Sequence, residues 1–424
     1  MSEVKEDCFQ GDDEMLPFLK GLEILHQSTH RVVGTETVSL PKALGRIVAE
    51  DILAPLNVPS HNNSAVDGYG VAFADLNKDA PTRLPVTARI AAGHPLDRPT
   101  TAGEAVQIFT GGAVPNGIDT VFMQEDVTRD GDDVLLPPGL KLGANCRLAG
   151  EDVKENDVII RAGSVLRAQE IGLAASVGLG RLLVFRPLRV AVFSTGDEIV
   201  DPVYDGANAV GDGQGTIYDV NRYSIAALLR GLGCEVTDLG VLQDKVAEIR
   251  SALHDAAAGH DLILTSGGVS MGEEDHITRV VESLGSIAFW RLAIKPGRPM
   301  AFGKIVDTAF IGLPGNPVAA MVIFMHVARP LILNLSGRID FDVPAYQVPA
   351  GFSFEKKKGR REWLRAWLET DDLGQMRVVN FPRQGSGLLT SMVAASGLVE
   401  LTEEVESVKP GDLVSFLSFR DMTQ

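Results

Sequence analysis

Short apolar runs typical of strands alternate with segments of helical periodicity between about residues 186 and 338. The expected strands span 188–193, 235–242, 262–265, 286–294, 299–305 and 308–313. The expected helices span 221–232, 245–258 and 317–334, the last opened by Asn316-Pro317 and ended by Gly337. Because strands that alternate with helices form parallel sheets covered by helices, this span predicts a parallel α/β domain.

The rest of the chain is patterned differently. Amphipathic helices are expected at 13–27 and within 160–180. The tract 56–150 is rich in Gly, Pro and Thr with short apolar runs, which indicates β-structure with tight turns, and the tail is again β-patterned. The expected fold class is therefore α/β plus β, in four domains: a composite N-terminal domain of 12–56 with 150–185, a β-rich inserted domain of 57–149, the α/β domain of 186–338 and a C-terminal β domain of 339–424.

Composition argues against several classes of function. Lys and Arg number 39 against 56 Asp and Glu, so the net charge of −17 argues against nucleic-acid binding. No run approaches the roughly 20 unbroken apolar residues of a membrane span, and the acidic start lacks the pattern of a secretory signal. Three cysteines without CxxC spacing argue against a disulfide framework. We therefore expect a cytoplasmic protein, without nucleic-acid or membrane partners, that concentrates positive charge locally to bind an anion.

Four loops are expected at the carboxyl edge of the sheet, where parallel sheets bind ligands. They hold Ser194 to Glu198, Asp244, Ser266 to Ser270, and Gly312 to Pro317. Glycines let backbone N–H groups approach phosphate oxygens, and the helix that begins at Pro317 adds the positive end of its dipole. One such loop is common in any α/β fold, but several on one edge favour a phosphorylated ligand. Neither GxGxxG after the first strand nor GxxxxGK[ST] is present, which argues against nicotinamide-cofactor or P-loop binding.

Charged residues at the same edge indicate a metal and an anion. Glu198, Asp244 and Asp275 each follow a strand, and carboxylates beside a phosphate need a cation such as Mg²⁺ between them. Helix capping is the alternative, and it suits Asp244. In the segment from Lys295 to Pro299, two prolines and a glycine restrict the backbone and would hold the charged side chains of Lys295 and Arg298 at a loop corner. Such a pair of positive charges suits a small dianion. The alternative there is a solvated turn.

Segments spread in order over nearly the whole chain resemble the MoeA family of molybdopterin molybdenumtransferases, whose animal relative is the gephyrin E domain. The segments are Leu40–Arg46, Asn63–Gly70, Thr110–Gly112, Gly150–Asp152, Phe193–Glu198, Ile217–Asn221, Ser266–Gly272, Phe289–Lys304, Gly312–Pro317 and Gln384–Ser386. The resemblance implies an elongated four-domain homodimer with an α/β domain similar to that of molybdopterin adenylyltransferases. It also implies an active site between the α/β domain of one subunit and the inserted domain of the other.

The reaction that this resemblance implies is molybdate-dependent hydrolysis of adenylyl-molybdopterin with Mg²⁺, giving AMP and the molybdenum cofactor. The molybdopterin adenylyltransferase is a further candidate partner. We predict catalytic roles for Asp67, Thr110, Asp152, Glu198, Asp244 and Asp275, of which Glu198, Asp244 and Asp275 would bind the metal. We predict substrate contacts for Arg147, Ser194, Ser266, Gly267, Gly268, Lys295, Arg298, Pro299, Pro314, Asn316, Arg360 and Ser386, with Arg365 as an alternative to Arg360.

Some positions depart from the family pattern. Arg291 and Arg298 stand where Lys is usual, and His61 and Asn62 precede the NSAVDGY run in place of Phe and Asp. Leu148-Ala149 follows Arg147 where basic residues are usual, and Ala319 replaces a Ser. The last two changes bear on affinity for the pterin or molybdate. The rival hypotheses are a non-catalytic molybdopterin-binding scaffold and a hydrolase of pyridine nucleotides.

Overall fold

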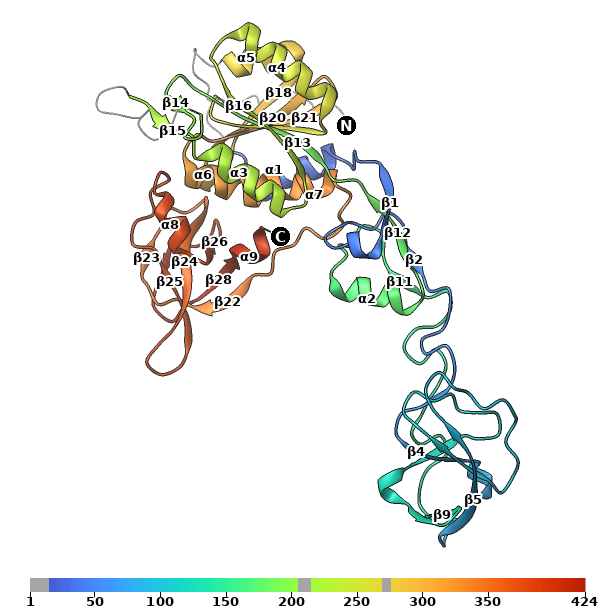
Figure 1. The fold of residues 1–424 in the computed structure, drawn as a ribbon. Coiled ribbons are helices and arrows are strands. Elements are labelled where there is room, and N and C mark those ends of the chain that lie inside the picture. The colour runs from blue at the N-terminus through green and yellow to red at the C-terminus, as the bar shows by residue number, and fades with distance from the viewer. Residues whose placement is uncertain (1–14, 205–214, 269–275, 424) are drawn as a thin grey trace.

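The computed structural model describes residues 15–204, 215–268 and 276–423 (Figure 1). The molecule is elongated. The inserted domain lies at one end, the α/β and C-terminal domains lie together at the other, and the composite N-terminal domain connects them (Figure 1).

Six strands form the sheet of the α/β domain, in the order β16-β13-β17-β21-β20-β18. Their bounds are β13 (Arg189–Thr195), β16 (Glu235–Leu242), β17 (Leu262–Ser266), β18 (Gly285–Arg291), β20 (Pro299–Ile305) and β21 (Thr308–Leu313). The first four in spatial order are parallel, but β20 is antiparallel to both β21 and β18. The expected parallel sheet is therefore mixed, because β18, β20 and β21 are joined by short connections and a parallel pairing needs a crossover of a dozen or more residues.

Helices cover both faces of this sheet. They are α3 (Asn221–Gly231), α4 (Val246–Gly259), α5 (His276–Leu284), α6 (Pro317–Ile323) and α7 (Arg329–Leu335), with a π-helical turn at Phe324–Ala328. Alternate side chains of β13 reach opposite cores. Val190 and Val192 pack with α3, α6 and α7, whereas Ala191 and Phe193 pack with α4 and α5. The first core also takes in α1 (Phe18–Ser28), so this helix packs with the α/β domain although it falls within the range 12–56 expected for the composite domain.

The segment Pro317–Leu335 is long and apolar enough by composition to cross a membrane, with a hydropathy of 1.8 over its most apolar window. However, 83% of that window is buried inside the protein, so the helix belongs to the core. His326 lies within it and stacks on Trp363 of the C-terminal domain at 4.1 Å between ring centroids. Burial, with Arg361 and Arg329 nearby, lowers the pKa of His326 to about 3, so the imidazole is a neutral core group.

The composite domain is built from two antiparallel strand pairs and a helix. β1 (Thr35–Ser39) pairs with β12 (Arg181–Phe185), and β2 (Ile52–Leu53) pairs with β11 (Val158–Ile160). The helix is α2 (Ala168–Ser176), and a 3-10 turn covers Leu40–Lys42.

The inserted domain has a six-stranded sheet in the order β7-β4-β6-β5-β9-β8 and a separate pair of β3 with β10. Its elements are β3 (Asn63–Ser64), β4 (Gly68–Val71), β5 (Thr82–Ile90), β6 (Ala105–Ile108), β7 (Thr120–Met123), β8 (Thr128–Asp130), β9 (Asp133–Leu136), β10 (Cys146–Arg147) and 3-10 turns at Phe73–Asp75 and Gln124–Asp126. The two chain segments that enter and leave this domain are bonded to each other. Val58 N–H donates to Val153 O at 2.8 Å, and Gly150 N–H donates to Pro59 O at 3.0 Å.

The C-terminal domain is a β-sheet in the order β19-β24-β26-β28-β22, with β25 also paired to β24. Its elements are β22 (Tyr346–Pro349), β23 (Phe354–Glu355), β24 (Arg361–Thr370), β25 (Met376–Asn380), β26 (Gly397–Leu401), β27 (Ser407–Val408), β28 (Leu413–Ser418), α8 (Leu389–Ala394) and α9 (Phe419–Met422). The remaining strand, β19 (Ile294–Lys295), comes from the α/β domain. The two domains therefore share backbone hydrogen bonds.

Candidate active site

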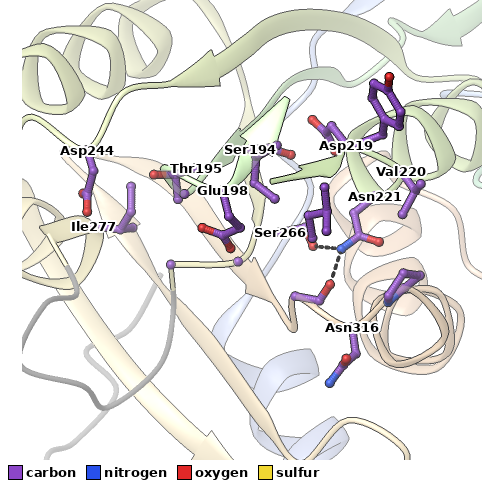
Figure 2. A pocket seen from close by; sticks show the side chains of 18 of the residues that line it. Ser194, Thr195, Glu198, Asp219, Val220, Asn221, Asp244, Ser266, Ile277 and Asn316 are labelled. Carbon is purple, nitrogen blue, oxygen red and sulfur yellow. Dashed lines mark hydrogen bonds between the residues drawn. The ribbon is translucent and has the colours of Figure 1, made fainter. Parts of the chain in front are cut away.

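A cavity of about 510 Å³ opens at the carboxyl ends of β13, β17 and β21 (Figure 2). One side is formed by an arm in which β14 (Ile199–Val200) pairs with β15 (Ile217–Tyr218). This first cavity brings together seven residues that the sequence analysis singled out: Ser194, Glu198, Asp244, Ser266, Gly267, Gly268 and Asn316. The cavity thus lies at the edge of the sheet where the sequence predicted that these loops meet.

Asn221, the first residue of α3, joins two of these loops. Its side-chain amide donates to Ser266 Oγ at 2.8 Å and to Gly315 O at 2.6 Å (Figure 2). Ser266 Oγ in turn donates to Pro314 O at 2.9 Å. Both loops are therefore fixed by side-chain hydrogen bonds at the floor of the first cavity.

Gly268 takes part in the same floor for a steric reason. Its φ is +63°, and a Cβ atom at this position would lie 2.5 Å from Thr195 Cγ2. Only glycine accepts both conditions without strain. The neighbouring Gly267 N–H donates to Leu313 O at 3.1 Å, so this amide holds the loop rather than a ligand, contrary to the role expected for it from the sequence.

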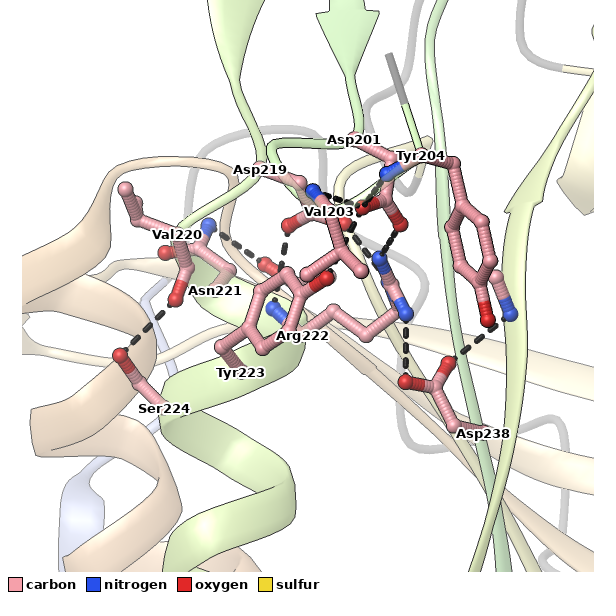
Figure 3. Close-up of polar contacts among 12 residues, drawn as sticks. Asp201, Val203, Tyr204, Asp219, Val220, Asn221, Arg222, Tyr223, Ser224 and Asp238 are labelled. Carbon is pink, nitrogen blue, oxygen red and sulfur yellow. Dashed lines mark hydrogen bonds and ion pairs between the residues drawn. The ribbon is translucent and has the colours of Figure 1, made fainter. Parts of the chain in front are cut away.

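Arg222, the next residue along α3, is the centre of an ion cluster that includes Asp219 of the cavity lining (Figure 3). Its guanidinium is 1% exposed and pairs with Asp219 at 2.9 Å, with Asp238 at 2.5 Å and with Asp201. These carboxylates come from the ends of β14 and β15 and from β16. One arginine therefore ties the arm to the sheet.

The Asp201 carboxyl is held in its charged form. Burial alone raises the pKa of Asp201, but hydrogen bonds from Val203 N–H and the Tyr223 hydroxyl, with the charge of Arg222, outweigh it and keep this pKa below its usual range. The pair of Asp201 and Arg222 is thus charged at neutral pH.

A second cavity of about 710 Å³ adjoins the first. The two share Glu198, Gly267, Gly268, Gly315 and Asn316 as lining residues. The second cavity also contains five further residues predicted from the sequence: Lys295, Arg298, Pro299, Pro314 and Ser386. Lys295 and Arg298 therefore face a cavity rather than a plain solvated turn.

The C-terminal domain completes the second cavity through the loop of Gln384, Gly385 and Ser386. Ser386 O accepts a hydrogen bond from Val318 N–H at 3.0 Å. Because Pro317 has no N–H, the first free amide of α6 is already used, and the helix start is less open to a phosphate than the sequence suggested. Asn316 is the N-cap residue, but its side chain makes no cap hydrogen bond.

Arg360 and Arg365 were predicted to reach the oxyanion, but neither lines the second cavity. Arg360 pairs with the buried Glu362 at 2.6 Å. Arg365 is 1% exposed and donates to Gly385 O at 3.0 Å, so it supports the loop of Ser386 from behind. Burial lowers the pKa of Arg365 to about 10, which leaves the guanidinium charged at neutral pH.

Two of the three predicted metal ligands lie in the first cavity. Glu198 is exposed there and Asp244 is half-buried, while Asp275 falls outside the described residues. Asp244 is not a helix cap, because α4 has Lys245 as its N-cap residue without a side-chain cap bond. Within residues 15–204, 215–268 and 276–423, no three His, Cys, Asp or Glu side chains form a metal site. Two carboxylates at one cavity still fit Mg²⁺, which takes few protein ligands and keeps several waters.

Four predicted residues lie outside both cavities, in or next to the inserted domain. Asp67 Oδ1 accepts hydrogen bonds from the Thr110 backbone N–H and hydroxyl, both at 2.7 Å, which lowers the pKa of Asp67. Arg147 is exposed in β10, which pairs with the segment just before Asp67, and Asp152 is exposed near the connection to the composite domain. The inserted domain lies at the opposite end of the molecule from the α/β domain that holds the cavities (Figure 1).

Three family models match the chain in sequence order. They describe the MoeA N-terminal region at residues 16–178, a probable molybdopterin-binding domain at 191–334 and the MoeA C-terminal region at 347–419. A molybdopterin molybdenumtransferase of Haemophilus influenzae is 40% identical over 92% of this chain and 95% of its own length. The chain belongs to the MoeA family.

Further members agree with this assignment. A molybdopterin molybdenumtransferase of Nostoc is 34% identical over 72% of this chain and 70% of its own length. A crystal structure of a MoeA protein of Pyrococcus horikoshii matches with a TM-score of 0.77 at 32% identity, over 96% of this chain and 99% of that one. The family prediction and the fold class predicted from the sequence are both confirmed.

Sequence reasoning missed part of this MoeA site. The sequence analysis included Ile217, Asp219 and Asn221 in a segment that resembles the family, but predicted no role for any of them. All three line the first cavity. A signal for Asn221 was present, because a polar residue in the first turn of an amphipathic helix after a strand faces the ligand edge. No local sequence pattern predicts the arm, because β14 and β15 have two residues each.

Proposed function

We propose that this protein catalyses molybdate-dependent hydrolysis of adenylyl-molybdopterin and inserts molybdenum into the dithiolene, releasing AMP. The observation that carries the proposal is that two adjoining cavities share one wall of glycine loops, with acids lining the first and cations lining the second. A nucleotide pyrophosphate and an oxyanion can therefore lie next to each other. The names of the relatives support the same chemistry.

The first cavity would hold the nucleotide. Ser194, Ser266 and Asn316 offer polar side chains beside the glycine loops, while Ile199 and Ile217 of the arm give an apolar wall for a ring system. Glu198 and Asp244 would hold Mg²⁺, and Asp275, which lies outside the described residues, stays a predicted third ligand. Bound there, Mg²⁺ would neutralise charge on the phosphoanhydride. The carboxylates of the chain thereby orient the bond that is cleaved.

The second cavity would hold molybdate as a substrate. Lys295 and Arg298 supply positive charge, and Ser386 supplies a hydroxyl donor. Placing the oxyanion beside the dithiolene makes its insertion effectively intramolecular. Ala319 lines this cavity where the family often has Ser, so one hydroxyl contact is missing here.

Release of AMP from adenylyl-molybdopterin, measured with and without molybdate, tests the proposal. We expect rapid release only when molybdate is present, because the proposed reaction couples cleavage to insertion. Equal rates in both arms would contradict the coupling. Binding of the pterin nucleotide without any turnover would favour the scaffold hypothesis instead.

Asn221→Ala should slow AMP release about tenfold, because it removes two hydrogen bonds that fix the cavity floor. A tenfold change in rate corresponds to about 1.4 kcal/mol of activation free energy. Ser224→Ala on the next turn of α3 is the matched control, because Ser224 Oγ bonds only within the helix, to Val220 O. Steady-state kinetics and melting temperatures of both variants make the comparison. Wild-type kinetics in Asn221→Ala would contradict a role for the two hydrogen bonds of Asn221 in the reaction.

A homodimer would bring the inserted domain to the cavities of its neighbour. Asp67 and Thr110 are hydrogen-bonded to each other, and the inserted domain to which they belong lies at the opposite end of the chain from the α/β domain (Figure 1). In the proposed dimer, these two residues, with Arg147 and Asp152, position the substrate across the subunit interface. We further propose that the enzyme works in the cytoplasm and receives its substrate from the molybdopterin adenylyltransferase.

Complementation between two inactive variants tests the shared site. Asp67→Asn and Asp244→Asn change different sides of it, so a mixed dimer would keep one intact site. Refolded or co-expressed mixtures should recover about a quarter of the wild-type AMP release, because half of the dimers are mixed and each has one good site. Each variant mixed with itself is the control, and mixtures that stay inactive would place all catalytic residues in one subunit.

A further inference from the structure

The lysine of the second cavity is held by a carboxylate that does not line the cavity. Lys295 Nζ lies 3.2 Å from Glu362 Oε2. The Glu362 side chain is 1% exposed, whereas that of Lys295 is 43% exposed and reaches the cavity. Glu362 therefore acts on the cavity only through the groups that it contacts.

Glu362 is fixed in place from the other side and through the backbone. Arg360 Nε and Nη2 both donate to Glu362 Oε1, at 2.7 and 2.6 Å. Lys295 and Glu362 are also register partners in the parallel pairing of β19 with β24, so they lie opposite each other across the domain boundary. Arg361 N–H donates to Ala293 O at 2.9 Å and extends this pairing.

The local balance of charge favours retention of this contact. Among the described residues, Glu362 Oε2 has no hydrogen bond of good geometry, and the Lys295 ammonium lies beside this oxygen while Arg360 pairs with Oε1. Without Lys295, this buried oxygen would lose its charged partner, which is unfavourable. Lysine is otherwise a flexible point charge on a long stem, and Arg298 on the same loop repels it.

We propose that Glu362 is a positioning residue, which anchors Lys295 from behind and makes the C-terminal domain a determinant of oxyanion affinity. The inference rests on the proposed function of the second cavity as the molybdate site. A dianion then meets an ammonium whose place is already fixed, and less conformational freedom is lost on binding.

A double-mutant cycle of Lys295→Gln and Glu362→Gln tests this, with molybdate affinity measured by calorimetry and AMP affinity as the readout of the first cavity. Each single variant should raise the Kd for molybdate about tenfold and leave that for AMP unchanged. If Glu362 acts through Lys295, the double variant should bind no more weakly than Lys295→Gln alone. Additive losses, or unchanged molybdate binding in Glu362→Gln, would overturn the inference.

The controls separate the inference from the function on which it rests. Glu404→Gln removes an 83% exposed carboxylate of the same domain and should change neither affinity. If Lys295→Gln itself binds molybdate normally, the second cavity is not the oxyanion site and the proposed function fails with the inference. If Glu362→Gln does not fold, Glu362→Asp replaces it, and its shorter side chain should give a loss of about threefold in the same cycle.

Discussion

The Asp244→Asn variant is expected to release AMP about a hundredfold more slowly than the wild type, because it removes one of the carboxylates proposed to hold Mg²⁺ in the first cavity. The amide keeps the shape of the side chain, so the loss reports its charge. Single-turnover AMP release, measured over a series of Mg²⁺ concentrations, gives the result. The half-saturating Mg²⁺ concentration should rise, and high Mg²⁺ should restore part of the rate.

Asp255→Asn is the matched control for this variant. Asp255 lies on α4, the helix that follows Asp244, and its side chain is 79% exposed. The control removes the same charge near the same helix, and we expect wild-type kinetics from it. An Asp244→Asn variant with a normal rate at low Mg²⁺ would contradict a role for this carboxylate in metal binding.

The second large effect is on stability. Arg222→Met should destabilise the α/β domain by about 3–5 kcal/mol, because it leaves the buried Asp201 and Asp219 without their cation. For a domain of this size such a loss corresponds to a fall of about 10 °C in melting temperature. Arg250→Met, on the exposed side of α4, removes an arginine without these partners and should melt like the wild type.

The pH dependence of the same variant separates charge from packing. The pKa of Asp201 is lowered in the folded protein, so its contribution to stability is present at neutral pH and is lost as the pH falls through the folded pKa. In Arg222→Met the part of that contribution that comes from the charge of Arg222 is already absent, while the hydrogen bonds from Val203 and Tyr223 remain. The difference in melting temperature between the two proteins should therefore narrow in acid, and a constant difference would assign the effect to lost packing instead.

The sequence predicted best those features that repeat locally. The strands and helices of the α/β domain follow from periodicity, and the clustering of Glu198, Asp244 and Gly268 follows from a rule about sheet edges. Two strand pairings in that sheet, β18 with β20 and β20 with β21, are antiparallel and not parallel as predicted. The connections between these strands are too short for parallel pairing.

What the sequence could not show are contacts between residues far apart in the chain. Lys295 with Glu362, Val318 with Ser386, and Arg222 with Asp201 each join separate elements, and no spacing rule links such pairs. For the same reason Arg360 and Arg365 were assigned to the anion. Only the fold reveals that their guanidinium groups are already used by Glu362 and Gly385.

The paired segments that connect the inserted domain have a mechanical consequence. Because Val58 is bonded to Val153 and Gly150 to Pro59, the connection is a two-stranded ribbon and not two loose tethers. It can flex or twist as a unit, but its length is set by the pairing. Residues added to one strand alone would break the ladder, whereas equal additions to both would lengthen the ribbon and move the inserted domain farther from the composite domain. The length of the paired connection thus sets the distance between the inserted domain and the composite domain.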